Sequence, residues 1–186
     1  MADTTRYHRR SIRLREFEYS AAGAYFVTVC AYTKQRLFGD IMDGEMKLNP
    51  FGEILRDEWL RSEAMRPEIK LDAFVIMPNH LHGIVGICRA DEVSTWAHSR
   101  APLQRTAKSL GSFVAQFKAS ATRRINAWRS KPEIRVWQRN YYEHILRNEA
   151  ELDRARQYIV ENPLKWELDR ENPSARTIED EEPWRA

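Results

Sequence analysis

The stretch "IKLDAFVIMPNHLHGIVGI", residues 69–87, decides the fold because it predicts two β-strands in succession. Apolar and β-branched residues fill both halves, and Pro78-Asn79 separates them at a turn. The second half contains two histidines, His80 and His82, with one residue between them. Side chains two positions apart on a strand share a face, so we expect both imidazoles to point one way and Leu81 to point into the core.

Upstream of this strand pair, the sequence predicts a strand, a hairpin and a helix. Residues 24–39 mix aromatic and β-branched residues and end at a glycine, which is typical of a strand. An Asp-Gly pair at residues 43–44 lies between short apolar runs and indicates a hairpin. A helix is expected to open at Pro50, because the apolar residues after it follow helical spacing.

Downstream, the pattern predicts two helices. Residues 103–128 carry apolar residues on one face and bases on the other. The last helix starts at Asn148, with Glu151 three residues on as in a capping box, and ends before Pro163. We assign no element to the aromatic and basic segment between them. The order of elements predicts an α+β, ferredoxin-like antiparallel sheet with the helices on one face, although periodicity does not establish the strand order.

Length and composition predict one domain. The chain has 186 residues, of which 42% are hydrophobic and 31% charged. We expect a basic N-terminal arm at residues 1–23, the folded domain at 24–166 and an acidic, loosely ordered tail at 167–186. No apolar run is long enough to cross a bilayer and no secretory signal is recognisable, so we expect a cytoplasmic protein without a membrane partner.

Charge is concentrated in the middle of the chain. Residues 101–148 hold ten bases and two acids. Such a segment favours a polyanion partner, because each neutralised phosphate releases counterions, but a solvated helix face would explain it equally well. The bases we consider candidates for phosphate binding are Lys118, Arg123, Arg124, Arg135 and Arg139.

The histidine pair and the last helix contain the candidate site residues. Two neutral imidazoles on one strand face can bind one divalent ion, although a structural pair facing solvent is the simpler alternative. Tyr158 and Asn162 are four residues apart and therefore lie on the same side of the last helix. Asn162 offers an oxygen suited to magnesium or manganese. Alternatively, Tyr158 is a boundary aromatic residue and Asn162 only a helix cap.

Three segments in this order resemble the REP-associated tyrosine transposases: "MPNHLHGIV" (77–85), "VWQRNYYEHILRNEAEL" (136–152) and "YIVENPLKW" (158–166). That family is a branch of the single-tyrosine HUH enzymes, and the similarity runs from about residue 25 to residue 166. It implies the HUH endonuclease fold, with a catalytic domain at 24–166. It also implies a metal-dependent single-stranded DNA endonuclease and strand transferase that cleaves near REP-type hairpins through a covalent 5′-phosphotyrosine.

The resemblance also implies roles for individual residues. His80 and His82 would bind Mg²⁺ or Mn²⁺, and Tyr158 would be the nucleophile. Insertion-sequence relatives have a glutamine four residues after the tyrosine as a third ligand, and this chain has the shorter Asn162 there. The implied partner is single-stranded or hairpin DNA, bound by a monomer or a homodimer.

Other interpretations of the same residues remain open. A non-catalytic module that binds single-stranded DNA or RNA would have the same basic surface, and a zinc hydrolase would also use the histidines. Tyr141 and Tyr142 compete with Tyr158 as nucleophiles, although base stacking or core packing suits them better. His144 and Trp137 match positions of the family to which we assign no role.

Overall fold

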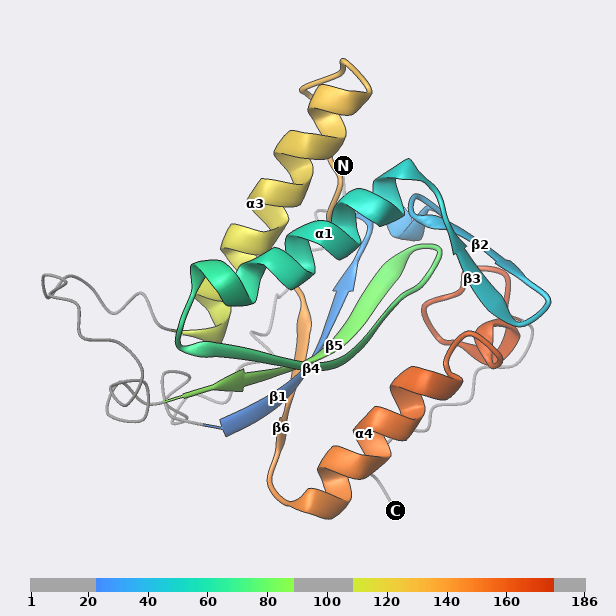
Figure 1. Cartoon of the computed structure of the whole chain (residues 1–186). Coiled ribbons are helices and arrows are strands. Elements are labelled where there is room, and N and C mark those ends of the chain that lie inside the picture. The colour runs from blue at the N-terminus through green and yellow to red at the C-terminus, as the bar shows by residue number, and fades with distance from the viewer. Residues whose placement is uncertain (1–22, 89–108, 176–186) are drawn as a thin grey trace, which may run out of the picture.

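The computed structural model describes residues 23–88 and 109–175, and its centre is a four-stranded antiparallel sheet (Figure 1). The strands follow the order β4-β5-β1-β6 across the sheet. Their bounds are β1 Gly23–Cys30, β4 Ile69–Ile76, β5 His80–Ile87 and β6 Tyr142–Leu146. If the four strands are numbered by their order in the chain, their order across the sheet is second, third, first, fourth. This is the ferredoxin-like arrangement. The predicted α+β class and antiparallel sheet are confirmed.

Two helices cover one face of this sheet. Helix α1 (Pro50–Met65) lies between β1 and β4 in the chain, and α3 (Leu110–Trp128) precedes β6. Both begin at a side-chain cap: Asn49 accepts hydrogen bonds from the first turn of α1, and Ser109 does so for α3. Their apolar faces pack with one side of the sheet into the larger core.

Helix α4 (Glu149–Glu161) lies on the opposite face, so the prediction that all helices share one face is wrong (Figure 1). Its residues Ala155 and Ile159 pack against Phe26, Ile84 and Leu146 in a second, smaller core. The physical reason is the alternation of the strands, which have apolar residues on both faces and would expose one face without α4. The predicted start of α4 is confirmed, because the Asn148 side chain accepts a hydrogen bond from the Glu151 amide.

The predicted hairpin is present as β2 (Gly39–Met42) and β3 (Glu45–Leu48). Asp43 and Gly44 both have positive φ, 54° and 75°, as a two-residue hairpin turn with the twist of its strands requires.

Strand β6 was not predicted. Among the strands that the structure describes, it lies at the sheet edge and pairs with β1 alone. Four of its five residues are only partly buried, so it lacks the apolar alternation that marks a half-buried strand.

The beginning of the acidic tail is folded, contrary to the prediction for residues 167–186. A 3₁₀ turn, η2 (Trp166–Leu168), follows α4, and Asp169 and Asn172 are buried beyond it. The rest of the tail, nearly all of the basic arm and the start of the predicted helix at 103–128 lie outside the described residues. Within the described ranges, no helix combines the length and the apolar character needed to cross a membrane.

Candidate metal centre and tyrosine

Strand β5 presents His80 and His82 to the side of the sheet that α4 covers. Leu81 and Val85 point into the larger core on the other side, as the strand period requires. The imidazoles are buried, with 0% and 1% of their surface exposed, and their ring centroids lie 4.4 Å apart. The expectation that the histidines share a face and Leu81 faces the core is therefore confirmed. The alternative of a solvent-facing pair is wrong, because both rings are buried.

Asn79 orients His80 through a hydrogen bond between its Oδ1 and the His80 Nδ1, at 2.8 Å. The Nδ2 of Asn79 donates to two backbone carbonyls, those of Lys34 and Glu171, so its oxygen must face the ring. Because an amide oxygen only accepts, Nδ1 of His80 carries the proton and Nε2 has a lone pair. This is the tautomer that a metal ligand needs.

Thr28 orients His82 from the neighbouring strand β1, with Oγ1 2.8 Å from the His82 Nδ1. Thr28 and His82 lie directly opposite each other in the ladder, which places the hydroxyl beside the ring. Among residues 23–88 and 109–175, the Nε2 of neither histidine has a hydrogen-bond partner. Two buried, unpartnered nitrogens side by side are costly unless another group binds them.

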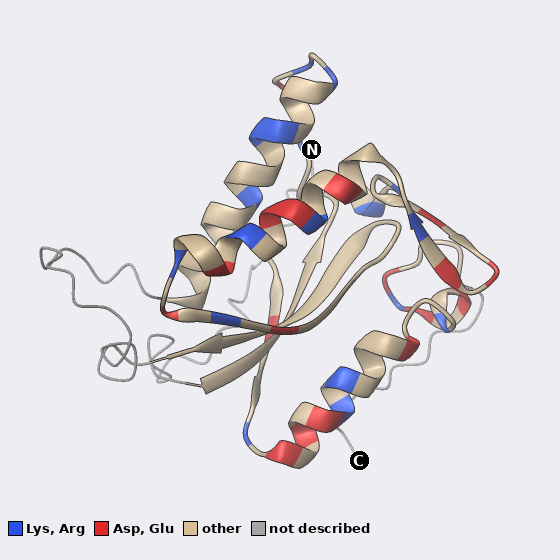
Figure 2. Ribbon diagram, viewed as in Figure 1, with Lys and Arg blue, Asp and Glu red and all other residues tan. Residues whose placement is uncertain are grey.

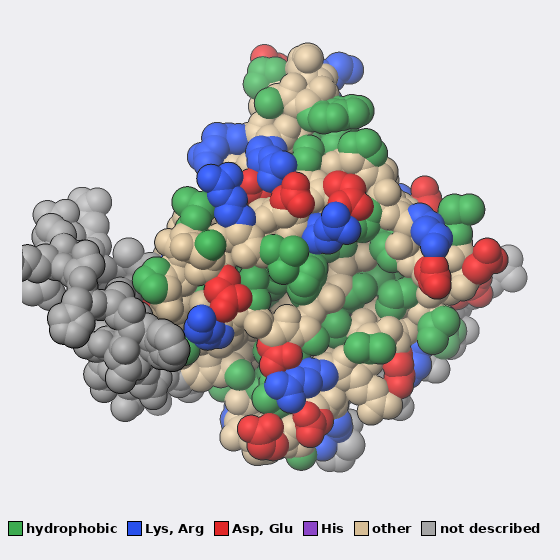
Figure 3. Space-filling model, in the orientation of Figure 1, with side chains coloured by type: hydrophobic (Ala, Val, Ile, Leu, Met, Phe, Trp, Pro, Cys, Tyr) green, Lys and Arg blue, Asp and Glu red, His purple; other side chains and the backbone are tan. Residues whose placement is uncertain are grey.

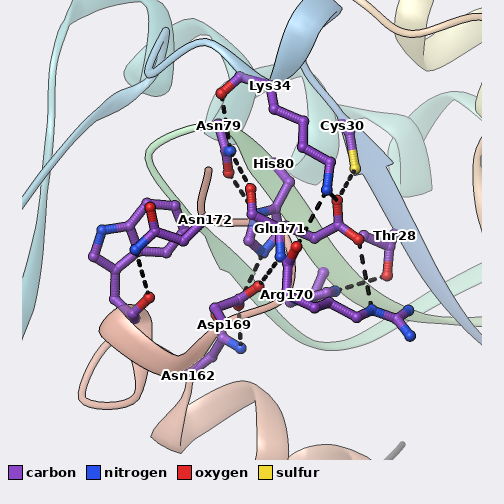
Figure 4. A network of polar contacts seen from close by, with 12 residues as sticks. Thr28, Cys30, Lys34, Asn79, His80, Asn162, Asp169, Arg170, Glu171 and Asn172 are labelled. Carbon is purple, nitrogen blue, oxygen red and sulfur yellow. Dashed lines mark hydrogen bonds and ion pairs between the residues drawn. The ribbon is translucent and has the colours of Figure 1, made fainter. Parts of the chain in front are cut away.

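Asp169 supplies a third possible ligand (Figure 4). Its Oδ2 lies 3.7 Å from the Nε2 of His80, and the ligand atoms of His80, His82 and Asp169 lie within 4.8 Å of one another. All three residues are buried. Two imidazoles and one carboxylate around a common point fit a divalent cation.

Asn162, the predicted third ligand, lies beside this group at the C-terminal end of α4. It is only 2% exposed, and its Nδ2 donates to the Asp169 Oδ2 at 3.1 Å. Its Oδ1 has no hydrogen-bond partner within the part of the chain that the structure describes. Asn162 is thus both the cap residue of α4 and an orienting group for the carboxylate, with an oxygen left for an ion.

Tyr158 reaches the same pocket one helical turn earlier. Its ring centroid lies 5.3 Å from that of His82 and 5.8 Å from that of Phe26. Burial raises the pKa of the Tyr158 phenol well above its usual value, and the charge of Asp169 adds to the increase. A nearby cation would therefore be needed to ionise this phenol.

The histidines are in the protonation state that metal ligation requires. Burial lowers the pKa of His80 to about 3 and that of His82 well below its usual value. Both imidazoles are therefore neutral at neutral pH.

The predicted phosphate-binding residues differ in how exposed their side chains are and in whether these side chains already have partners. The Lys118 ammonium donates to the carbonyls of Gln138 and Asn140, both at 2.9 Å, and so fixes the segment before β6. Burial also lowers the pKa of Lys118 to about 8. Lys118 therefore has a structural role, and its part in phosphate binding stays a prediction.

Arg124 is paired as well. Its guanidinium donates to Glu58 at 2.9 Å and to Asp57 at 3.2 Å, so acids of α1 neutralise part of the basic face of α3. Figure 2 shows basic positions along α3 and acidic positions along the neighbouring α1, and Figure 3 shows basic and acidic side chains close together on this face. The candidates that remain exposed are Arg123, Arg135 and Arg139.

The competing tyrosines lie on opposite faces of the sheet. Tyr141 packs against the larger core, away from the histidines. Tyr142 packs on the α4 side, and the Arg170 guanidinium lies 5.1 Å from its ring centroid. His144, on the same strand, has its Nε2 3.4 Å from the Glu151 carboxylate, which ties β6 to the start of α4.

Sequence reasoning missed Asp169, Asn79 and Thr28. Asp169 is one of many acids in its segment, and no spacing links it to the histidines. Asn79 had a usable signal, because it directly precedes His80 at the turn. Thr28 becomes visible only once the β1–β5 register is known.

A solved structure of a REP-associated tyrosine transposase bound to a REP hairpin superposes with a TM-score of 0.56, at 21% identity, over 84% of this chain and 74% of that one. The chain thus has the fold of the REP-associated tyrosine transposases. It belongs to the same family as an uncharacterized protein of Haemophilus influenzae, with 40% identity over 178 residues, 89% of this chain and 97% of the relative. No family model matches the chain.

Proposed function

We propose that this protein is a metal-dependent, single-stranded DNA endonuclease and strand transferase that acts through a covalent tyrosine intermediate. The observation that supports it most is the buried His80–His82 pair, in which neither Nε2 has a hydrogen-bond partner among the described residues. The His82 ring of this pair lies 5.3 Å from the Tyr158 ring, measured between centroids. A purely structural pair would not leave both nitrogens without a partner. The fold shared with a REP-associated tyrosine transposase supports the same reaction class.

The ion would be held by His80, His82 and Asp169, with the Oδ1 of Asn162 as a further oxygen donor. Carboxylate and amide oxygens suit Mg²⁺ or Mn²⁺, and the two imidazoles favour Mn²⁺ of the two. When bound, such an ion neutralises charge on a phosphate and lowers the pKa of a nearby phenol. Asn79 and Thr28 would hold the imidazoles in the orientation for ligation.

Tyr158 would perform the chemical step. Its phenolate oxygen would form a bond to the phosphorus while the bond from phosphorus to the 3′-oxygen breaks, and that oxygen leaves as a hydroxyl after taking up a proton. The product is a 5′-phosphotyrosine and a free 3′-hydroxyl. Because the phosphodiester bond energy is retained in the covalent link, a 3′-hydroxyl can reverse the step and join strands.

The proposed substrate is DNA with an unpaired segment, including the flank of a hairpin. The related transposase structure contains a REP hairpin, which motivates hairpin probes for this chain. The exposed bases Arg123, Arg135 and Arg139 would contact phosphates, which positions a strand without reading its sequence.

A covalent-trapping experiment tests the proposal. Wild-type protein incubated with Mn²⁺ and a labelled hairpin oligonucleotide with a single-stranded flank should form an adduct that survives denaturing electrophoresis. Excess EDTA should prevent it, since the phenol pKa is raised in the metal-free site. Tight DNA binding without any adduct would instead indicate the non-catalytic binding module.

The Thr28 hydroxyl should matter for metal affinity although it would not touch the ion. Thr28→Val removes the oxygen at 2.8 Å from His82 while keeping the shape of the side chain. We expect Mn²⁺ affinity, measured by calorimetry without DNA, to fall about 10- to 100-fold. Thr28→Ser keeps the hydroxyl and should bind Mn²⁺ like the wild type, and equal affinity in all three proteins would rule out this orienting role.

A further inference from the structure

Directly after β1, whose Cys30 pairs with His80 in the ladder, the chain exposes an aromatic ring. Tyr32 opens the 3₁₀ turn η1 (Tyr32–Lys34), and 40% of its surface is exposed. The Arg135 guanidinium lies over this ring, 5.6 Å from its centroid. We call Tyr32 and Arg135 together the Tyr32 stack. A cation on one part of an aromatic face leaves a flat, polarised surface open to a further planar group.

The turn that carries Tyr32 is held against the metal centre. Thr33 and Lys34 both have positive φ, 56° and 54°, which costs free energy in residues other than glycine. The strain is offset by backbone hydrogen bonds from the Tyr32 N–H to the Val136 carbonyl at 2.8 Å and by the Asn79 Nδ2 bond to the Lys34 carbonyl at 3.0 Å. Asn79 therefore orients His80 and anchors the Tyr32 turn at once (Figure 4).

The Tyr32 turn continues the strand that pairs with the histidines. Cys30 lies directly across the ladder from His80, and Tyr32 follows two residues later, roughly 7 Å further at about 3.3 Å per residue. A DNA strand that holds a phosphate at the histidines and runs along this end of β1 would pass the Tyr32 turn.

The charges around the Tyr32 stack suit a polyanion. The segment that supplies Arg135, residues 129–139, contains four bases and one acid. Arg139 is exposed in the same segment. An aromatic platform beside exposed arginines is the combination that binds unpaired nucleotides, because bases stack on the ring while phosphates pair with the cations.

We infer that the Tyr32 stack binds an unpaired base of the DNA strand whose phosphate lies at the histidine pair. The inference rests on the proposed function and adds where the strand continues from the site. Tyr32 provides the stacking face, and Arg135 holds the ring and pairs with an adjacent phosphate. Neither residue takes part in the chemical step.

The test compares DNA affinity in EDTA, where cleavage is prevented. The probe is a fluorescein-labelled oligothymidylate of about 16 nucleotides, followed by anisotropy. Tyr32→Ala should bind roughly tenfold more weakly or worse, and Tyr32→Phe should bind like the wild type. Met65→Ala, which removes another exposed side chain at the far end of α1, should have no effect. Circular dichroism checks that each variant is folded.

An abasic oligomer of the same length separates stacking from charge. The loss in Tyr32→Ala should disappear with this probe, whereas Arg135→Ala should weaken binding of both probes. Equal affinity of Tyr32→Ala and wild type for oligothymidylate, in a protein that still forms the covalent adduct, would overturn the stacking inference alone. A wild-type protein that neither binds the probe nor forms an adduct would overturn the proposed function as well.

Discussion

Tyr158→Phe should reduce formation of the covalent DNA adduct by a factor on the order of 10³ or more. The substitution removes one oxygen and leaves the ring that packs against Phe26 and His82, so the fold and the metal ligands are retained. Binding of the hairpin oligonucleotide and of Mn²⁺ should therefore change little. The measurement is denaturing electrophoresis of labelled DNA, with binding followed separately by anisotropy.

Tyr142→Phe is the matched control. Tyr142 packs on the same face of the sheet as His82, but the Arg170 guanidinium lies over its ring. This variant should form the adduct at the wild-type rate. If Tyr142→Phe loses the adduct and Tyr158→Phe keeps it, the nucleophile is Tyr142 and our assignment is wrong.

Acid should destabilise the metal-free protein strongly between about pH 6.5 and pH 3. Burial holds the pKa of His80 at about 3, whereas the unfolded chain takes up the proton near the ordinary value of 6.5. Below that value the unfolded state binds more protons than the folded state, so the free energy of unfolding falls as pH falls. At about pH 5 the loss from His80 amounts to about 2 kcal/mol.

His82 should add to this loss, since burial, His80 and Arg170 all lower its pKa. The Glu171 carboxylate acts on His80 in the opposite direction, because its charge raises the pKa, and the value of about 3 already includes this effect. Urea unfolding in EDTA, followed by tryptophan fluorescence near pH 8 and near pH 5, measures the difference. A His80→Gln/His82→Gln double variant should show a smaller change over this range. Equal wild-type stability at the two pH values would contradict the burial of the imidazoles.

Local signals predicted several elements of this fold correctly. The Asp43-Gly44 turn, the helix opening at Pro50 and the cap at Asn148 each depend on residues that are neighbours in the chain. Such features need no tertiary contact, because turn geometry and capping act over a few residues. Strand β6 carried no such signal, because it forms by pairing with the edge of β1.

In the candidate site, too, some features could be predicted from the local sequence and others depend on tertiary contacts. Strand alternation was enough to predict that His80 and His82 share a face, but it could not say which helix covers that face. The likeness to a known family singled out Tyr158 and Asn162, and the structure places both beside the histidines. Lys118 and Arg124 were predicted as phosphate contacts from charge alone, yet their partners come from distant parts of the chain.

The sequence by itself determined the strands around the histidine pair, the capped helices and the shared direction of the two imidazoles. Only the tertiary structure decided that α4 packs on the second face of the sheet and that Asp169 joins His80 and His82. The physical reason is the sequence separation of the interacting residues. Propensity, periodicity and capping depend on residues that are neighbours in the chain. Burial and ligand geometry depend on segments that meet only when the β1–β5 register, helix α4 and residues 166–172 come together.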